Sequence, residues 1–141
     1  MRVCEILNKK GDAVFKISQN ESLADVVARM VNFNCGSLVV CDENLIVGII
    51  TERDILKSIE SQKKDLCELL VCNFMSRNLI VGHPLDEVGE IMGKMTSNRI
   101  RHLPIFDDER LVGLISIGDV VKAMFEVLVE ENHYLKVYIQ G

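Results

Sequence analysis

The chain repeats itself once along its length. When residues 22–57 are moved forward by 65 positions without a gap, eight of the 36 aligned pairs are identical, where average residue usage gives about two. The identical pairs are Met30/Met95, Leu38/Leu103, Asp42/Asp107, Val47/Val112, Gly48/Gly113, Ile50/Ile115, Asp54/Asp119 and Lys57/Lys122. Because an internal repeat determines domain organisation and symmetry, it constrains this chain more than its other sequence features do.

The apolar spacing within each copy predicts a β-α-β-β-α unit of mixed α/β (α+β) class. The predicted segments of the first copy are strand 14–17, helix 22–33, strands 37–41 and 45–50, and a helix from 51; those of the second are strand 79–81, helix 85–95, strands 102–106 and 111–115, and a helix from 117. One such unit is too small to bury its own sheet, so we expect both copies to pack about a pseudo-twofold axis as one module.

The two copies also define the expected division of the chain. Residues 1–66 would hold an N-terminal segment with the first repeat, and residues 67–141 the second repeat with a C-terminal helix. Residues 66–76 are expected to be a connector.

Composition excludes several classes of partner. The 141 residues are 48% hydrophobic and carry a net charge of −5 without a basic tract, which argues against nucleic acid as a partner. No apolar run approaches the ~20 residues that span a bilayer, and residues 1–5 lack the apolar stretch of a signal peptide. We therefore expect a cytoplasmic protein with no membrane partner.

The cysteines do not suggest a metal or redox site. There are five, an odd number, and none forms a Cys-x-x-Cys pair. They are expected to be small buried hydrophobes in a reducing compartment. A metal site would need partners at ligand spacing, which His83, His102 and His133 do not provide.

Three sequence phrases resemble a known family. Gly48–Asp54 and Gly113–Asp119 follow one pattern, Gly-x-x-Thr/Ser-x-x-Asp, and residues 99–105 read Arg-Ile-Arg-His-Leu-Pro-Ile. Together with the β-α-β-β-α order, these resemble the CBS domain, which occurs in tandem as the Bateman module. Ser116–Lys122 and the tail Glu130–Gly141 are also similar to stand-alone bacterial CBS-pair proteins.

The resemblance implies a sensory function. CBS pairs bind adenosine-containing ligands such as AMP, ATP, NAD or S-adenosylmethionine in clefts between the two motifs, and they are not catalysts. An adenine nucleotide is therefore the expected ligand, with no cofactor required. An enzyme is the least supported class, because the repeats already occupy the 141 residues.

Residue chemistry agrees with such a ligand at the end of each hairpin. Where a strand ends and a helix begins, free N–H groups and the helix dipole favour a phosphate. A carboxylate can accept two hydrogen bonds from a ribose diol. By resemblance, Asp54 with Thr51 and Asp119 with Ser116 would contact the ligand. The apolar slot for adenine has its candidates in Ile17, Val81, Ile100 and Pro104.

A purely structural interpretation of the same residues stays open. Thr-x-x-Asp and Ser-x-x-Asp are also typical of a helix capping box, which would explain both pairs without a ligand.

The basic residues are open to two interpretations as well. Arg101 and His102 either face ligand phosphates, as the resemblance implies, or form a solvated edge that pairs with nearby carboxylates. The first repeat has Gly36-Ser37 at those positions, and its Arg53 is matched by Gly118 in the second. We therefore expect the two clefts to differ in phosphate chemistry.

Two hypotheses remain at this point. The first is a non-catalytic sensor that signals to a regulated protein; the alternative is a structural protein-interaction and dimerisation module without a functional ligand. The expected apolar helix faces exceed what a small module covers and predict a homodimer, unless the monomer itself buries them. Those faces are Val26/Val27/Met30, Ile55/Ile59, Ile91/Met92/Met95 and Val120/Met124/Phe125.

Overall fold

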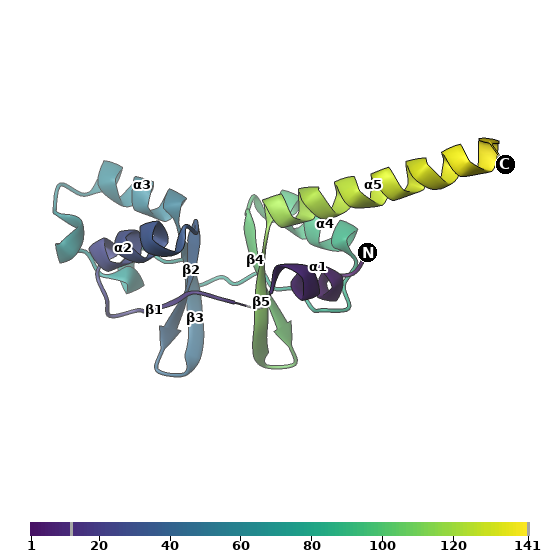
Figure 1. Ribbon diagram of the computed structural model, residues 1–141. Helices are drawn as coiled ribbons and strands as arrows, with labels where there is room; N and C mark the ends of the chain where they lie inside the picture. Colours follow the sequence, from purple (N-terminus) through teal and green to yellow (C-terminus); the bar gives the residue numbers. More distant parts are fainter. Residues whose placement is uncertain (12, 141) are drawn as a thin grey trace. The chain divides into compact units, whose positions relative to one another are not determined.

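Each copy of the repeat forms its own compact unit. The computed structural model describes residues 1–11 and 13–140 of the chain (Figure 1). The first-repeat unit is Val14–Leu79, and the second-repeat unit combines Met1–Ala13 with Ile80–Gly141. This division differs from a boundary after residue 66, because residues 66–79 pack with the first repeat and the N-terminal segment packs with the second.

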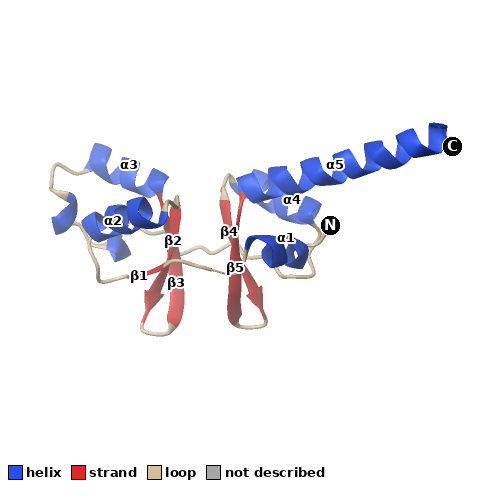
Figure 2. Cartoon of the chain, viewed as in Figure 1, coloured by secondary structure: helices blue, strands red, loops and turns tan. Residues whose placement is uncertain are grey.

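The first-repeat unit is built on a three-stranded sheet. Strand β1 (Lys16–Ser18) pairs parallel with β2 (Ser37–Asp42), and β2 pairs antiparallel with β3 (Leu45–Thr51). Helices α2 (Leu23–Phe33) and α3 (Glu52–Ser61) lie on one face of this sheet (Figure 2). The predicted elements of the first repeat are therefore present, with ends that shift by a few residues.

Helix α2 begins and ends where its sequence signals place it. Ser22 and Asp25 form a reciprocal capping box at the N-terminus, and Asn34 adopts a left-handed conformation (φ 51°) at the C-terminus. Leu23 and Val26 are fully buried against the sheet. The 3.6-residue period of the sequence thus corresponds to a real core face.

The segment expected to be only a connector completes the core of the first-repeat unit. It forms two short 3-10 turns, η1 (Leu66–Glu68) and η2 (Val71–Asn73). Leu69 and Val71 are buried, and the Leu69 carbonyl accepts a hydrogen bond from the Leu23 amide at 2.8 Å. The connector is therefore part of the fold, which is why it groups with the first repeat.

The second-repeat unit contains a two-stranded sheet and three helices among its described residues. Strands β4 (His102–Asp107) and β5 (Arg110–Ser116) form an antiparallel hairpin. Helices α1 (Val3–Lys10), α4 (Val88–Asn98) and α5 (Ile117–Gln140) lie on one side of it (Figures 1 and 2).

Two predictions for this unit need correction. Residues 79–81 do not form a strand; backbone pairing beside β4 is limited to a bridge between Gly82 and Ile105, so no ladder develops. Helix α4 begins at Val88 instead of residue 85, because a turn from the Asp86 amide to the His83 carbonyl (3.0 Å) occupies the preceding residues.

Helix α1 was not predicted, and it explains why the N-terminus belongs to the second repeat. Val3, Ile6 and Leu7 are buried in the core of this unit. Leu7 packs so closely on the hairpin that a Cβ added to Gly113 would lie 2.5 Å from its Cδ2 atom.

The sequence repeat is also a structural repeat. Left-handed non-glycine residues occur at Asn34 and Arg99, and again at Glu43 and Asp108, each pair 65 positions apart. Both hairpins have a register shift at equivalent places, after Val40 and after Ile105. Each repeat therefore specifies the same local backbone independently.

A basic side chain tethers the repeat-related helix in each unit. Arg29 of α2 donates to the Lys16 carbonyl at 2.6 Å, and Lys94 of α4 donates to the Val81 carbonyl at 2.9 Å. All four residues follow the 65-position offset.

Most of the apolar faces from which a homodimer was predicted are buried within their own unit, so that part of the argument was wrong. The residues below 10% exposure are Val26, Met30, Ile55, Ile91, Met95 and Val120. Ile59, Met124 and Phe125 remain exposed, at 57%, 39% and 65%. Most of the exposed large apolar residues in the described part of the chain lie on α5.

The cysteines are less buried than expected. All five are free thiols; four are half-buried and Cys67 is exposed. Burial raises the pKa of the Cys35 and Cys41 thiols. No described helix is long and apolar enough to cross a membrane.

Candidate functional site

The first candidate carboxylate caps the helix that follows β3. The Asp54 Oδ2 atom accepts hydrogen bonds from the Thr51 amide (2.9 Å) and the Thr51 hydroxyl (3.2 Å), and the Asp54 amide donates to Thr51 Oγ1 at 3.4 Å. This is a complete capping box. The interpretation of Thr51 and Asp54 as a helix cap is therefore confirmed.

The second repeat has the same reciprocal pair at the start of α5. The Ser116 amide donates to Asp119 Oδ2 at 2.8 Å, and the Asp119 amide donates to Ser116 Oγ at 3.1 Å. In both repeats the hydrogen bonds found for the carboxylate among the described residues converge on Oδ2. Capping thus leaves Oδ1 able to accept from a ligand hydroxyl.

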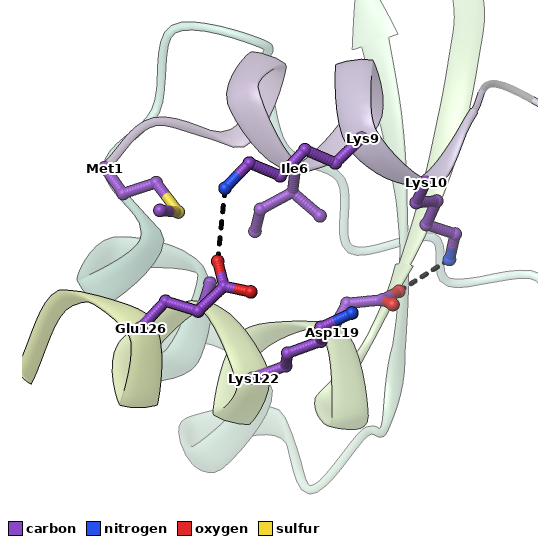
Figure 3. A pocket seen from close by; sticks show the side chains of 8 residues that line it. Met1, Ile6, Lys9, Lys10, Asp119, Lys122 and Glu126 are labelled. Atoms are coloured by element: carbon purple, nitrogen blue, oxygen red, sulfur yellow. Dashed lines mark hydrogen bonds and ion pairs between the residues drawn. The ribbon is translucent and has the colours of Figure 1, made fainter. Parts of the chain in front are cut away.

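Lys10 distinguishes the second site from the first. Its Nζ atom lies 2.5 Å from Asp119 Oδ2 and also donates to the Leu114 carbonyl at 2.8 Å (Figure 3). Burial by itself would raise the pKa of Asp119, but hydrogen bonds from Lys10 and Ser116 and the lysine charge outweigh it and lower that pKa. Asp119 is therefore an anchored carboxylate that stays ionised.

Sequence reasoning missed Lys10. The start of the chain carried a usable signal for α1, namely Val3, Ile6 and Leu7 at helical spacing with Lys9 and Lys10 before Gly11. Nothing local could connect Lys10 with a carboxylate 109 residues away.

A small pocket of about 90 Å³ lies between α1 and α5 beside this ion pair (Figure 3). Its lining residues are Met1, Ile6, Lys9, Lys10, Asp119, Lys122, Ala123 and Glu126. Pockets for drug-sized ligands measure roughly 300–1,000 Å³, so this one is too small to hold a nucleoside by itself.

Several second-repeat candidates lie together at one end of the β4–β5 hairpin. His102 is paired with Ser116 in the sheet register, and the Arg101 carbonyl accepts from the Ile117 amide at 2.8 Å. Arg101 is exposed and His102 half-buried. The backbone therefore holds these two basic residues beside the hydroxyl and the start of α5.

The first repeat has the same backbone geometry at the end of its hairpin, with Gly36-Ser37 in place of the two basic residues. Ser37 is paired with Thr51, and the Gly36 carbonyl accepts from the Glu52 amide at 3.1 Å. Arg53 follows on α3 and is exposed. The chemical difference between the two hairpin ends, expected from sequence, thus occurs on matched backbones.

The candidates for the adenine slot differ in accessibility. Ile17 is 1% exposed in the core and Pro104 is buried in β4, so neither side chain is accessible in this structure. Val81 is 38% exposed, and Ile100 is half-buried after the left-handed Arg99. Val81 lies next to Pro104, since the neighbouring Gly82 amide donates to the Pro104 carbonyl at 2.9 Å.

The described residues contain no group of three His, Cys, Asp or Glu side chains placed to hold a metal ion.

With this geometry in place, comparison with known proteins assigns the family. The CBS domain pattern matches residues 3–61 and 71–126. The chain therefore belongs to the CBS domain family and is a tandem CBS pair. It has the mixed α+β fold of solved CBS pairs, as the sequence resemblance implied.

Individual relatives cover most of the chain. The CBS domain-containing protein CBSX3, mitochondrial, of Arabidopsis thaliana is 34% identical over 99% of this chain and 72% of its own length. The crystal structure of a CBS-domain containing protein from Agrobacterium tumefaciens aligns with a TM-score of 0.85 and 32% identity over 88% of this chain and 99% of that one.

A further similar structure contains ligands. The CBS domain pair of protein MJ0100 was solved in complex with 5′-methylthioadenosine and S-adenosyl-L-methionine. It aligns with a TM-score of 0.79 and 26% identity over 89% of this chain and 97% of that one.

Proposed function

We propose that this chain is a non-catalytic regulatory module that binds an adenosine-containing ligand such as AMP, ATP, NAD or S-adenosylmethionine. The observation that carries the proposal is the repeat-related pair of carboxylates, each fixed by a hydroxyl residue at the start of a helix with Oδ1 left to accept. The ligands of the MJ0100 pair, both built on adenosine, support the same chemical class.

Different residues would contact different parts of the ligand. Asp54 or Asp119 would accept hydrogen bonds from ribose hydroxyls, and the helix N-terminus with Thr51 or Ser116 would face phosphate or ribose oxygens. Ile17, Val81, Ile100 and Pro104 would form the apolar slot for the adenine, and Val81 and Ile100 are the more accessible of the four.

The two repeats differ in charge and would therefore differ in how they bind a phosphate. Arg101 and His102 provide cationic and hydrogen-bonding groups in the second repeat, whereas the first repeat has Arg53 at a different position, where the second has Gly118. An Arg guanidinium binds phosphate through two parallel hydrogen bonds, so we expect the repeats to differ in affinity for phosphorylated ligands.

We also propose a cytoplasmic homodimer that passes its signal to a regulated protein. Five free thiols suit a reducing compartment, and the exposed apolar side chains of α5 provide a surface for association.

A thermal-shift series tests ligand binding. AMP, ATP, NAD, S-adenosylmethionine and 5′-methylthioadenosine are added separately to the purified protein; a ligand at 100 times its Kd stabilises by about 2.7 kcal/mol. We expect at least one to raise the midpoint, and Asp54→Ala or Asp119→Ala to reduce that response.

Asp25→Ala is the matched control. Asp25 forms the same capping box with Ser22 at the start of α2, but the proposal gives it no contact with the ligand. It should lower stability without ligand while leaving the ligand response intact. If none of the five compounds shifts the midpoint, the proposal is wrong.

A structural interaction module is the second candidate. It is favoured by the complete capping boxes, which already give both carboxylates a role. On this alternative, Asp54→Ala and Asp25→Ala would each cost about 1 kcal/mol of stability. Asp119→Ala would cost more, because it also removes the partner of Lys10. No ligand response would exist to lose.

A further inference from the structure

Helix α5 carries an apolar face that its own unit does not cover. Val120 and Ala123 of α5 are buried against the unit, whereas every described residue from Leu128 onward is exposed. The C-terminal half of the helix projects beyond α1 and α4 (Figure 1). Its exposed large apolar residues are Val121, Met124, Phe125, Leu128, Val129, Tyr134, Leu135, Val137, Tyr138 and Ile139.

Part of this surface follows the heptad spacing of a coiled coil. Six positions are separated by alternating steps of four and three residues, and five of them are apolar: Val121, Phe125, Leu128, Asn132, Leu135 and Ile139. In heptad terms Phe125, Asn132 and Ile139 occupy a positions, and Val121, Leu128 and Leu135 occupy d positions. Val120 and Ala123 fall at c and f, so the side of α5 used by its own unit is not this seam.

The polar member of the seam indicates the orientation of a partner helix. In a parallel in-register pair, Asn132 meets its own equivalent, and the two amides can hydrogen-bond. An antiparallel pair sets a positions against d positions, which would place Asn132 opposite an apolar residue such as Leu128 and leave its amide unsatisfied. A single Asn at an a position specifies register and a two-stranded state.

The flanking charges agree with the same arrangement. Glu131 lies at a g position and Lys136 at the e position five residues later. In a parallel dimer these two positions of opposite helices are neighbours, so the pair forms twice, once on each side. Met124 and Val129 occupy the corresponding g and e positions one heptad earlier, and both are apolar.

We propose that residues 121–139 of α5 form a parallel, in-register two-stranded coiled coil with α5 of a second copy of this chain. The seam would be about 27 Å long at 1.5 Å per residue. This inference deepens the homodimer proposed above by naming its surface, and it does not depend on the ligand.

Oligomeric state tests the seam, with a control on the same helix. Leu135→Glu places a charge at a d position, whereas Val137→Glu makes a similar change at an f position outside the seam; the two residues are 61% and 53% exposed. Sedimentation equilibrium should find a dimer for the wild type and for Val137→Glu. Leu135→Glu should weaken dimerisation at least about tenfold, because it buries an unpaired charge.

The outcomes separate the two levels of the proposal. A monomeric wild type would overturn both the homodimer and the seam. A Leu135→Glu protein that dimerises as tightly as the wild type would overturn the seam while leaving a homodimer through another surface. Circular dichroism confirms that each variant is folded, which is expected because position 135 makes no buried contact in its own unit.

A disulfide cross-link tests the orientation. Ile139→Cys at an a position should give a covalent dimer on mild oxidation, because a residues face each other in a parallel pair. Val137→Cys is the position control, and the wild type measures cross-linking through the native thiols. If Ile139→Cys cross-links no better than these two, the parallel arrangement is wrong.

Discussion

The Lys10–Asp119 ion pair should contribute more to stability than a neighbouring ion pair between the same two helices. Lys10 Nζ lies 2.5 Å from the Asp119 carboxylate, and their side chains are 34% and 23% exposed. Lys9 and Glu126 also join α1 to α5, at 3.2 Å, but they are 66% and 39% exposed. Water screens the Lys9–Glu126 pair more, so this pair should contribute less to stability. It therefore serves as the reference for the Lys10–Asp119 pair within the same helix–helix interface.

Double-mutant cycles measure both couplings. For Lys10→Ala with Asp119→Ala we expect about 1 kcal/mol, the upper end for partly exposed pairs; for Lys9→Ala with Glu126→Ala we expect less than about 0.5 kcal/mol. In a domain of this size 1 kcal/mol corresponds to a change of about 3 °C in Tm. Urea denaturation at low and high salt gives the free energies of unfolding, and salt should reduce both couplings.

The pH dependence follows from the lowered pKa of Asp119. A carboxyl whose pKa is lower in the folded state contributes stability above its ordinary pKa, 3.8, and loses it as pH falls through the folded value. The Lys10–Asp119 coupling should therefore stay constant from neutral pH down to about pH 5 and decline below about pH 4. A coupling no larger than that of Lys9–Glu126, or one lost already near pH 6, would refute the reasoning.

Three further changes test other parts of the structure. Gly48→Ala should destabilise the protein by about 1–3 kcal/mol in urea denaturation, and by more than Gly113→Ala does. The added Cβ at position 48 would lie 2.6 Å from the fixed Ser76 carbonyl oxygen, whereas the added Cβ at position 113 would meet only the mobile end of the Leu7 side chain. Equal losses of stability in the two variants would contradict this. Thr51→Ala should lower the free energy of unfolding by about 1 kcal/mol through loss of the cap, and an unchanged value would show that the cap contributes nothing. Exposed Cys67 should react with a thiol reagent at neutral pH faster than Cys41, whose pKa is raised by burial; mass spectrometry of the modified peptides gives the order, and the reverse order would exclude this assignment.

The local structure of each repeat was predictable because its signals are local. Ser22 with Asp25, and the turns at Glu43 and Asp108, depend on residues a few positions apart, so they were readable without the rest of the chain. The absence of a strand at 79–81 was not predictable in this way, because a strand forms only where a neighbouring strand offers hydrogen bonds along its edge. Beside β4 this pairing is limited to Gly82.

The candidate carboxylates were also predicted from local sequence signals, but the residues that surround them in the folded chain were not. The pattern around Thr51 and Ser116 identified both the capping pair and the family. It could not place Lys10 on Asp119, because that contact requires α1 to pack beside β5 and the start of α5.

By itself, then, the sequence determined the repeat, the β-α-β-β-α order of the first copy, the α-β-β-α order of the second, most of the caps, and the family. The tertiary structure decided which unit each terminal segment joins, which apolar faces are buried, and which of two equivalent carboxylates has a cationic partner. The physical reason is range: capping and periodicity act over three or four residues, whereas burial and ion pairing depend on segments as far apart as residues 10 and 119, which only the folded chain brings together.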